Sequence, residues 1–437
     1  MTSLTVHEWG RVSVYNDGGP TPEGQFSRRQ ANALLAAAKM HPLGGNEGTA
    51  ILVDHHRHLT ARQMVGVIAA SGCSLEILPK IDPQEVQTDG AIRNRLVRML
   101  DVALGLNLGD GQTAAMARQN ETLLDILIRL FADRLLAEAR RGLPRAYLAE
   151  QEDLAALRGR LNVVRQFTHN AVRPDRLACQ FDTLLADTPL LRIMKACVLF
   201  LRRHARTAET IRRLDELRFL MADVGDNSPS SLPWKQVRID RTNRRWETLY
   251  GLARMFLKRD WQATHHDASA GHGITLLFPM NKLFEAYIAA LAKRSLRGSH
   301  SVVIAQGGLL NCLIEDGEGG KERFQTKPDI LIKHGSHIRM VIDTKWKRIG
   351  SDPGDSKRGV SQADIYQMMA YARLYRTTEV LLLYPHYDAL GVTDLNAAYS
   401  MLGGNERLRV VSVDLVSGEA AIVQRLVELT CIPGAPA

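Results

Sequence analysis

The sequence of 437 residues contains little cysteine and no long apolar run. Its five cysteines are odd in number, far apart and without a C-x-x-C pair: Cys73, Cys179, Cys197, Cys312 and Cys431. This pattern excludes a disulfide framework and a zinc knuckle. No segment approaches the roughly 18 apolar residues that a membrane helix needs, and the first residues lack the pattern of a signal peptide. We therefore expect a cytoplasmic protein without a membrane partner.

Acidic residues are outnumbered by basic ones. The sequence has 47 acidic residues against 56 lysines and arginines, which gives a formal net charge of +9. This moderate excess of positive charge permits a polyanionic partner such as nucleic acid but does not require one. With 45% apolar residues the chain has an ordinary globular composition, and its length suffices for two or three domains. A disordered or collagenous chain is excluded.

Apolar residues follow three patterns along the chain, which predicts an α/β multidomain protein. Residues 1–81 contain short extended runs between turns and one helix from Ser27 to Ala38, and predict a mixed, β-rich N-terminal domain. Residues 82–262 carry apolar stripes at helical spacing and predict a mainly helical middle region. Its many arginines favour a solvated surface, with a phosphate- or partner-contacting face as the alternative. Residues 271–437 alternate helix and strand, after a linker expected at residues 264–273.

The candidate chemistry lies in residues 326–347, which read as two strands joined by a three-residue turn. In the second strand, the period of two places Asp343 and Lys345 on the same face. With such a turn, Asp329 is expected opposite Val341, so that its carboxylate shares the face of Asp343. A shift of one residue in register would turn these side chains away from one another.

Two carboxylates on one face can hold a hard divalent cation such as Mg²⁺, with water completing its coordination. A neighbouring ammonium can position a water molecule and offset the charge that builds on a phosphate. The minimum set of side chains for metal-dependent hydrolysis of a phosphodiester is therefore present, as Asp329, Asp343 and Lys345. The pattern is short. An alternative interpretation, in which these residues are charged side chains on the surface of an edge strand, fits it about equally well.

The sequence on either side of this hairpin favours the site over the surface charges. An amphipathic helix before the hairpin carries Glu285 at the edge of its apolar stripe. A helix after the hairpin carries Asp364, Gln367 and Tyr371 on one face. Trp346 falls on the opposite face of the second strand, where packing is expected and stacking on DNA is the alternative.

These segments resemble the PD-(D/E)xK nucleases that have a RecB-like Q-x-x-x-Y helix. The segments that carry this resemblance are Phe284-Glu285, Pro328-Asp329, Asp343-Thr344-Lys345 and Gln367-Met368-Met369-Ala370-Tyr371. More closely, the chain resembles the McrC family of nuclease subunits in McrBC 5-methylcytosine-specific restriction systems. That resemblance adds, in order, Glu8-Trp9-Gly10, Ile77-Leu78-Pro79-Lys80-Ile81, Leu157-Arg158-Gly159-Arg160-Leu161, Met280-Asn281-Lys282-Leu283 and Leu383-Tyr384-Pro385. It spans essentially the whole chain.

The resemblance implies a C-terminal domain with the PD-(D/E)xK restriction-endonuclease-like α/β fold, which cuts double-stranded DNA containing modified cytosine. The site residues that it implies are Asp329, Asp343, Lys345, Glu285, Gln367 and Tyr371. Asp329 and Asp343 are implied as Mg²⁺ ligands, and Glu285 as a further contact to the metal or to water. Gln367 and Tyr371 are implied to support the site or to touch the DNA backbone.

The resemblance also implies a partner, the hexameric AAA+ GTPase McrB, which the N-terminal region binds and stimulates. Residues 319–322 lack the first glycine and the Ser or Thr of a P-loop, so GTP is expected to belong to the partner. Two alternatives stay open: a freestanding RecB-like nuclease in repair or defence, and a non-enzymatic GTPase-activating adaptor with a vestigial nuclease site. Because the blocks read as separate domains, a chain without residues 1–81 is expected to lose the partner and keep a folded nuclease domain.

Overall fold

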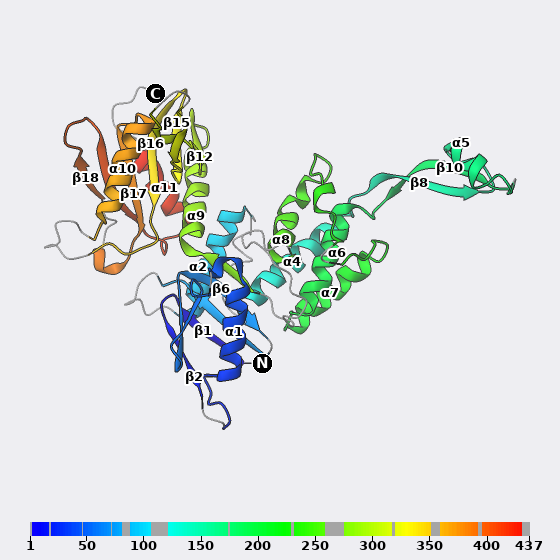
Figure 1. Ribbon diagram of the computed structural model, residues 1–437, viewed down its shortest axis with the longest axis horizontal. Helices are drawn as coiled ribbons and strands as arrows, with labels where there is room; N and C mark the ends of the chain where they lie inside the picture. Colours follow the sequence, from blue (N-terminus) through cyan, green and yellow to red (C-terminus); the bar gives the residue numbers. More distant parts are fainter. Residues whose placement is uncertain are drawn as a thin grey trace. The chain divides into compact units, whose positions relative to one another are not determined.

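The computed structural model describes residues 2–16, 19–45, 47–70, 72–80, 88–105, 121–173, 175–228, 231–257, 275–316, 320–350, 359–391 and 396–430 (Figure 1). The chain forms two compact units, one of Met1–Leu123 with His265–Ala437 and one of Leu124–Thr264. The N-terminal and C-terminal blocks thus belong to one unit, which differs from the three consecutive blocks expected from the sequence. The expected linker lies outside the described residues. None of the described helices combines the length and apolar character needed to cross a bilayer.

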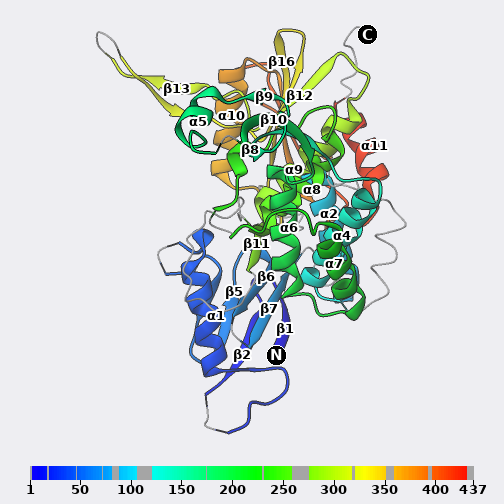
Figure 2. The ribbon, with the colours of Figure 1, turned by 90° about the vertical axis from the view of Figure 1, so that its right-hand side faces the viewer.

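The N-terminal part of the first unit is rich in strands, as expected, and contains two four-stranded sheets. Their strand orders are β1-β7-β6-β11 and β3-β2-β5-β4. The strands are β1 (Thr2–His7), β2 (Arg11–Tyr15), β3 (Phe26–Ser27), β4 (Leu52–Asp54), β5 (His58–Ala61), β6 (Met64–Ala70), β7 (Cys73–Leu78) and β11 (Leu276–Pro279). Figure 2 shows β11 beside β6, with which it pairs antiparallel although about 200 residues separate them in the sequence. A strand from the C-terminal block therefore completes an N-terminal sheet.

Helix α1 (Arg28–Met40) begins where the sequence predicts. The Ser27 hydroxyl accepts a hydrogen bond from the backbone N–H of Gln30, and the Gln30 side chain accepts one from the N–H of Ser27. This reciprocal pair satisfies two N–H groups that the helix leaves unpaired. The helix buries Leu34 in one core with Phe26 and with Leu277 of β11. A 3-10 turn, η1 (Pro42–Gly44), follows α1, and α2 (Asp89–Leu104) packs on a helix of the C-terminal part.

The C-terminal part of the first unit is built on a six-stranded mixed sheet with the order β12-β15-β16-β17-β19-β18. Strands β16, β17 and β19 run parallel, and the other pairs are antiparallel. Its elements are α9 (Met280–Ser295), β12 (Ser301–Ala305), β15 (Ile330–His334), β16 (His337–Thr344), α10 (Gln362–Tyr375), β17 (Glu379–Pro385), η5 (Asp388–Leu390), β18 (Asn396–Ser400), β19 (Arg407–Val413) and α11 (Glu419–Thr430). A separate hairpin pairs β13 (Asn311–Ile314) with β14 (Glu322–Gln325).

Helices cover both faces of this sheet. Leu331, Val341 and Leu382 lie on one face and share a core with Met368 of α10. Because strand side chains alternate, their sequence neighbours point to the other face, against which α9 packs, with α11 on α9. The carboxyl ends of the parallel strands meet at one edge, where β16 leads into Lys345.

The second unit contains helices α4 (Leu123–Arg140), α5 (Val163–Thr168), α6 (Pro189–Arg202), α7 (Ala208–Leu220) and α8 (Glu247–Leu257), with 3-10 turns η3 (Trp234–Gln236) and η4 (Arg244–Trp246). It also contains a three-stranded sheet that was not predicted from the sequence. The sheet is formed by β8 (Ala146–Leu154), β10 (Leu177–Leu185) and β9 (Arg160–Leu161). Most of β8 is exposed or half-buried, so it lacks the alternation of apolar residues that marks a strand packed on a core. The other described elements of this unit are helices and 3-10 turns, as expected.

Candidate active site

The hairpin of β15 and β16 brings the predicted carboxylates together, in a register different from the one expected. His334 pairs with His337, so the turn has two residues, and a bulge follows in β16. Leu331 therefore lies opposite Val341, and the prediction that Asp329 does so is wrong. The shorter turn and the bulge each shift the register by one residue. A total shift of two keeps every side chain on its face, so the carboxylates still share one.

Asp329 is held at the start of β15 by Thr344, the last residue of β16. Its Oδ2 atom accepts hydrogen bonds from the backbone N–H and from the hydroxyl of Thr344, both at 2.8 Å. Burial raises the pKa of Asp329 to about 6, and the charges of Asp343 and Glu285 contribute. This carboxylate is therefore fixed in place close to two other carboxylates.

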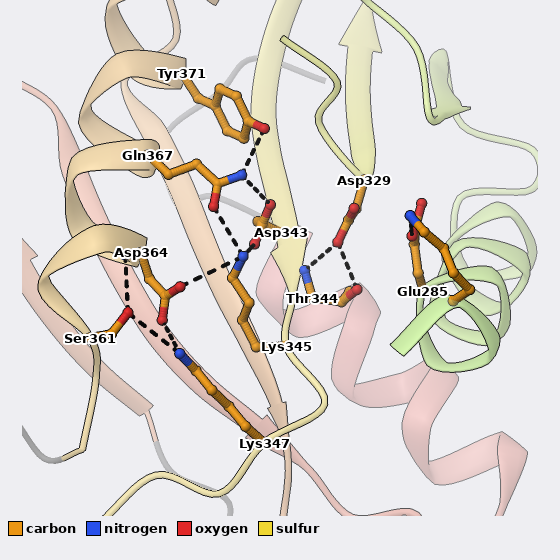
Figure 3. A network of polar contacts seen from close by, with 11 residues as sticks. Glu285, Asp329, Asp343, Thr344, Lys345, Lys347, Ser361, Asp364, Gln367 and Tyr371 are labelled. Carbon is orange, nitrogen blue, oxygen red and sulfur yellow. Dashed lines mark hydrogen bonds and ion pairs between the residues drawn. The ribbon is translucent and has the colours of Figure 1, made fainter. Parts of the chain in front are cut away.

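Asp343 and Lys345 face the same space, as the strand period predicts (Figure 3). The Lys345 ammonium lies 2.7 Å from Oδ2 of Asp343, whose side chain is 3% exposed. Burial raises the pKa of Asp343, although Lys345 opposes this shift. Burial alone would lower the pKa of Lys345, but the charge and hydrogen bond of Asp343 raise it. The lysine is therefore a firmly charged ammonium in the site.

Helix α10 adds an amide and a phenol to this pair (Figure 3). Gln367 accepts a hydrogen bond from the Lys345 ammonium at 3.0 Å and donates to Oδ1 of Asp343 at 3.3 Å. The same amide donates to the hydroxyl of Tyr371 at 2.8 Å. Burial raises the pKa of Tyr371 to about 12, so its hydroxyl stays neutral. The Q-x-x-x-Y spacing thus places both side chains one helical turn apart on the face that covers the site.

Glu285 reaches the site from helix α9, on the side of Asp329 (Figure 3). Its side chain is 5% exposed, and Oε2 pairs with the ammonium of Lys282 at 2.8 Å. Its other oxygen, Oε1, is buried and has no hydrogen-bond partner among the described residues. Figure 3 shows Glu285 beside Asp329, and the charge of Glu285 contributes to the raised pKa of both Asp329 and Asp343. The structure therefore brings all six predicted site residues into one region, in which direct contacts join Lys345, Asp343, Gln367 and Tyr371 into a network.

Two residues of this network had no role assigned from the sequence. Asp364, in the first turn of α10, forms an ion pair with Lys347 and lies 3.7 Å from the Lys345 ammonium. Burial would raise the pKa of Asp364, but hydrogen bonds from Lys347 and Ser361 lower it. Asp364 shares a helical face with Gln367, a spacing visible in the sequence. Nothing in the sequence marks the pairing with Lys347, because it depends on how the chain leaves β16.

The residues fit a hard cation held by few protein ligands. Within the described parts of the chain, no group of three or more His, Cys, Asp or Glu side chains is arranged to hold a metal ion. Mg²⁺ needs no such group, since it is usually bound through one or two carboxylates, with water and substrate oxygens completing its shell. Asp329 and Asp343 offer these two carboxylates, and the unpaired oxygen of Glu285 lies nearby. A catalytic rather than a structural metal site is consistent with this arrangement.

A family model described as "McrBC 5-methylcytosine restriction system component" matches residues 59–385, well over half of the chain. Among solved structures, the chain resembles one in a half-complex of the tetradecameric assembly of Thermococcus gammatolerans McrB AAA+ hexamers with bound McrC. The match has 20% identity and a TM-score of 0.70, and covers 98% of this chain and 100% of that one.

A second similar structure is the cryo-EM structure of the Thermococcus gammatolerans McrBC complex. This match has 23% identity and a TM-score of 0.54, and covers 68% of this chain and 88% of that one. At these identities the two matches show a shared fold. No curated protein matches the chain significantly.

Proposed function

Since the chain belongs to the McrBC 5-methylcytosine restriction system component family, we propose that it is the McrC-type, DNA-cutting subunit of such a system. The observation that carries this proposal is the network of Asp329, Asp343 and Lys345 around one space. Asp329 lies at the start of β15 and Asp343 near the end of β16. Lys345 follows Asp343 by two residues. This arrangement supports the PD-(D/E)xK restriction-endonuclease-like fold that we propose for the C-terminal part of the first unit.

In the proposed reaction, the chain hydrolyses a phosphodiester of double-stranded DNA. Asp329 and Asp343 would hold Mg²⁺, which supplies Lewis-acid stabilisation of the charge on the phosphate. The Lys345 ammonium would hold the attacking water and offset negative charge as it develops on the phosphate oxygens. Gln367, which accepts a hydrogen bond from the ammonium, would hold it where this charge develops.

We assign the remaining residues of the network to support of these three. Glu285 offers an acceptor for a water molecule or a further contact to the metal, because its Oε1 atom has no hydrogen-bond partner in the described structure. Tyr371 restrains the amide of Gln367 and keeps a neutral hydroxyl. Both would act on the position of the reacting groups, since their side chains are anchored by helices packed on the sheet.

The proposed partner is a McrB-like AAA+ GTPase hexamer. Two structures that share the fold of this chain are assemblies of McrB with McrC. The sequence has no P-loop, so the GTP would be bound and hydrolysed by the partner. We propose that the complex acts on DNA with modified cytosine, in keeping with the description of the family.

The test is cleavage of methylated and unmethylated plasmid by the purified chain with Mg²⁺, with and without its GTPase partner and GTP. We expect cleavage of the methylated plasmid in the complete mixture alone. Cleavage by the chain without the partner would favour a freestanding nuclease. Stimulated GTP hydrolysis with no cleavage would favour an adaptor whose nuclease site is silent.

A further inference from the structure

A cavity of about 330 Å³ lies where the chain leaves the candidate active site. Its walls include Glu8, Trp9, Lys80, Trp346, Lys347 and Arg348. The last three directly follow Lys345 in the sequence, and Pro385, which ends the neighbouring strand β17, also lines the cavity. The cavity therefore opens at the same edge of the sheet as the candidate site. The proposed function uses none of its lining residues.

Two indole rings give the cavity flat apolar surfaces. The Trp346 ring is buried and donates its Nε1–H to Glu8 at 3.1 Å. Gln63 fixes the same residue by donating to its backbone carbonyl at 3.2 Å. The Trp9 ring is 54% exposed, with the Arg62 guanidinium 5.3 Å from its centroid. An exposed ring such as that of Trp9 can stack on a nucleobase regardless of sequence, whereas the Trp346 ring packs on Phe284 at 5.3 Å and forms part of the cavity wall.

The carboxylate of Glu8 gives the cavity a buried acceptor. Its Oε2 atom accepts hydrogen bonds from Trp346 and from the backbone N–H of Lys80. Its Oε1 atom has no partner among the described residues, and the whole residue is only 1% exposed. A buried acceptor without a donor is costly, so a ligand that brings an N–H group would be favoured here. Nucleobases carry such groups on their edges.

The charges at the cavity decide between two kinds of occupant. A basic side chain from a protein partner would pair with Glu8 and stack on the indoles. It would also be repelled by Lys80 and Arg348, both of which are exposed, whereas the charge of Lys347 is compensated by Asp364. A phosphate group is attracted by Lys80 and Arg348. A nucleotide combines the three features that the cavity favours: a base that can stack, an N–H donor and a phosphate.

We propose that this cavity takes one unstacked nucleotide of the DNA strand that the neighbouring active site cuts. The inference rests on the proposed function, because the DNA must run past Lys345 for its next nucleotide to reach Trp346. The base would lie against the indoles with an N–H group donated to Glu8, and the adjoining phosphate would contact the cations. The cavity would hold the strand in register with the catalytic residues.

The test compares two short fluorescent duplexes, one fully paired and one with a single extrahelical nucleotide. Their binding to the full chain is measured by anisotropy in EDTA, so that no cleavage occurs. We expect wild-type protein to bind the extrahelical nucleotide about tenfold more tightly than the paired duplex, since stacking of one base contributes about 1–3 kcal/mol. Trp9→Ala should abolish this preference and leave the fold intact, because the Trp9 ring is exposed. Arg348→Gln should weaken binding of both duplexes and flatten its salt dependence.

Two control variants lie elsewhere on the same sheet. Tyr399→Ala removes an exposed ring from β18, and Arg407→Gln removes an exposed cation from the amino end of β19, opposite the edge that holds the cavity. Both should leave the preference unchanged. Equal affinity of the wild type for the two duplexes, or no binding of either, would overturn the inference. Displacement of the DNA by an equal concentration of a free mononucleotide would also overturn it. The cleavage test above has a separate readout, so a failure of this inference can be distinguished from a failure of the proposed function.

Discussion

Gln367 accepts a hydrogen bond from the ammonium of Lys345 at 3.0 Å, and it does so from a helix rather than from the strand that carries the lysine. The contact joins α10 to the end of β16. A lysine side chain has four rotatable bonds, and without such a partner the ammonium would sample several positions. The contact therefore selects, from these positions, the one that faces Asp343.

Replacing Gln367 with alanine should lower the rate of DNA cleavage about 10- to 100-fold. The change frees the ammonium of Lys345 and also removes the hydrogen bond that the Gln367 amide donates to Oδ1 of Asp343, so the rate should fall and the concentration of Mg²⁺ at half-maximal rate should rise with it. Gln362→Ala, on the same helix but exposed, is the matched control. Unchanged single-turnover cleavage by Gln367→Ala would remove the positioning role.

Asp343→Asn should reduce cleavage by at least about 1,000-fold, because a proposed metal ligand loses its charge and several kcal/mol of charge stabilisation with it. Stimulation of GTP hydrolysis by the partner should be retained, since the side chain is buried in the candidate site. Asp316→Ala, an exposed aspartate in the turn of the β13–β14 hairpin, serves as control. Cleavage at the wild-type rate by Asp343→Asn would refute the site.

Thr344→Val should raise the concentration of Mg²⁺ needed for half-maximal cleavage and lower the rate about tenfold. The valine keeps the shape of the side chain but deletes the hydroxyl that donates to Asp329, while the backbone N–H still donates. A hydrogen bond to a charged group contributes about 1.5–3 kcal/mol, which is enough for this effect. Thr344→Ser should restore the Mg²⁺ dependence. A titration of Mg²⁺ that does not distinguish valine from threonine would contradict the prediction.

The sequence is most informative where one local pattern determines the geometry. The period of two places Asp343 and Lys345 on one face without knowledge of the register, and the helical period places Gln367 beside Tyr371. The exact register was predicted incorrectly, because the turn has two residues instead of the expected three and because a bulge in β16 has no signature in the composition of the strand. The predicted shared face of the carboxylates is nevertheless correct, since a register error of two residues leaves each side chain on the same face of the sheet.

Contacts over long sequence separations could not be predicted from these patterns. Glu8 and Trp346 are 338 residues apart, and each reads as an ordinary member of its own block. Likewise β11 reads as the start of the C-terminal block, although it completes an N-terminal sheet. Such pairings depend on which surfaces remain to be covered once the local elements exist, and a single sequence does not encode that in its periodicity.

Glu8 makes the stability of the protein depend on pH. Burial raises the pKa of this carboxyl from 4.5 to about 7, against hydrogen bonds from Trp346 and Lys80 that lower it. Between these two values the folded state holds more protons than the unfolded state, so the free energy of unfolding falls as the pH rises from about 4.5 to 7. The loss is up to about 3 kcal/mol.

Glu8→Gln should remove this part of the pH dependence, because glutamine keeps the acceptor for Trp346 and carries no charge. Urea unfolding at pH 5 and pH 8 measures the effect as the difference between variant and wild type. The exposed Glu23→Gln should behave as wild type at both values. Parallel curves for Glu8→Gln and wild type would show that burial does not shift the pKa of Glu8.

Deleting residues 1–81 should unfold the C-terminal part of the first unit rather than release it as a free domain, the reverse of the expectation from the sequence. The deletion removes β6, the partner strand of β11, and would expose Leu276, Leu277 and Phe278, each at most 2% exposed in the intact protein. Exposing them forfeits about 1.5–3 kcal/mol for each large apolar side chain. A chain without residues 1–81 should therefore aggregate or lack a cooperative melting transition. Gly66→Ala tests the same contact in the full chain: its Cβ would lie 2.0 Å from the backbone oxygen of Leu276, so the melting temperature should fall sharply. A soluble deletion product that melts cooperatively would show that the C-terminal part folds without this sheet.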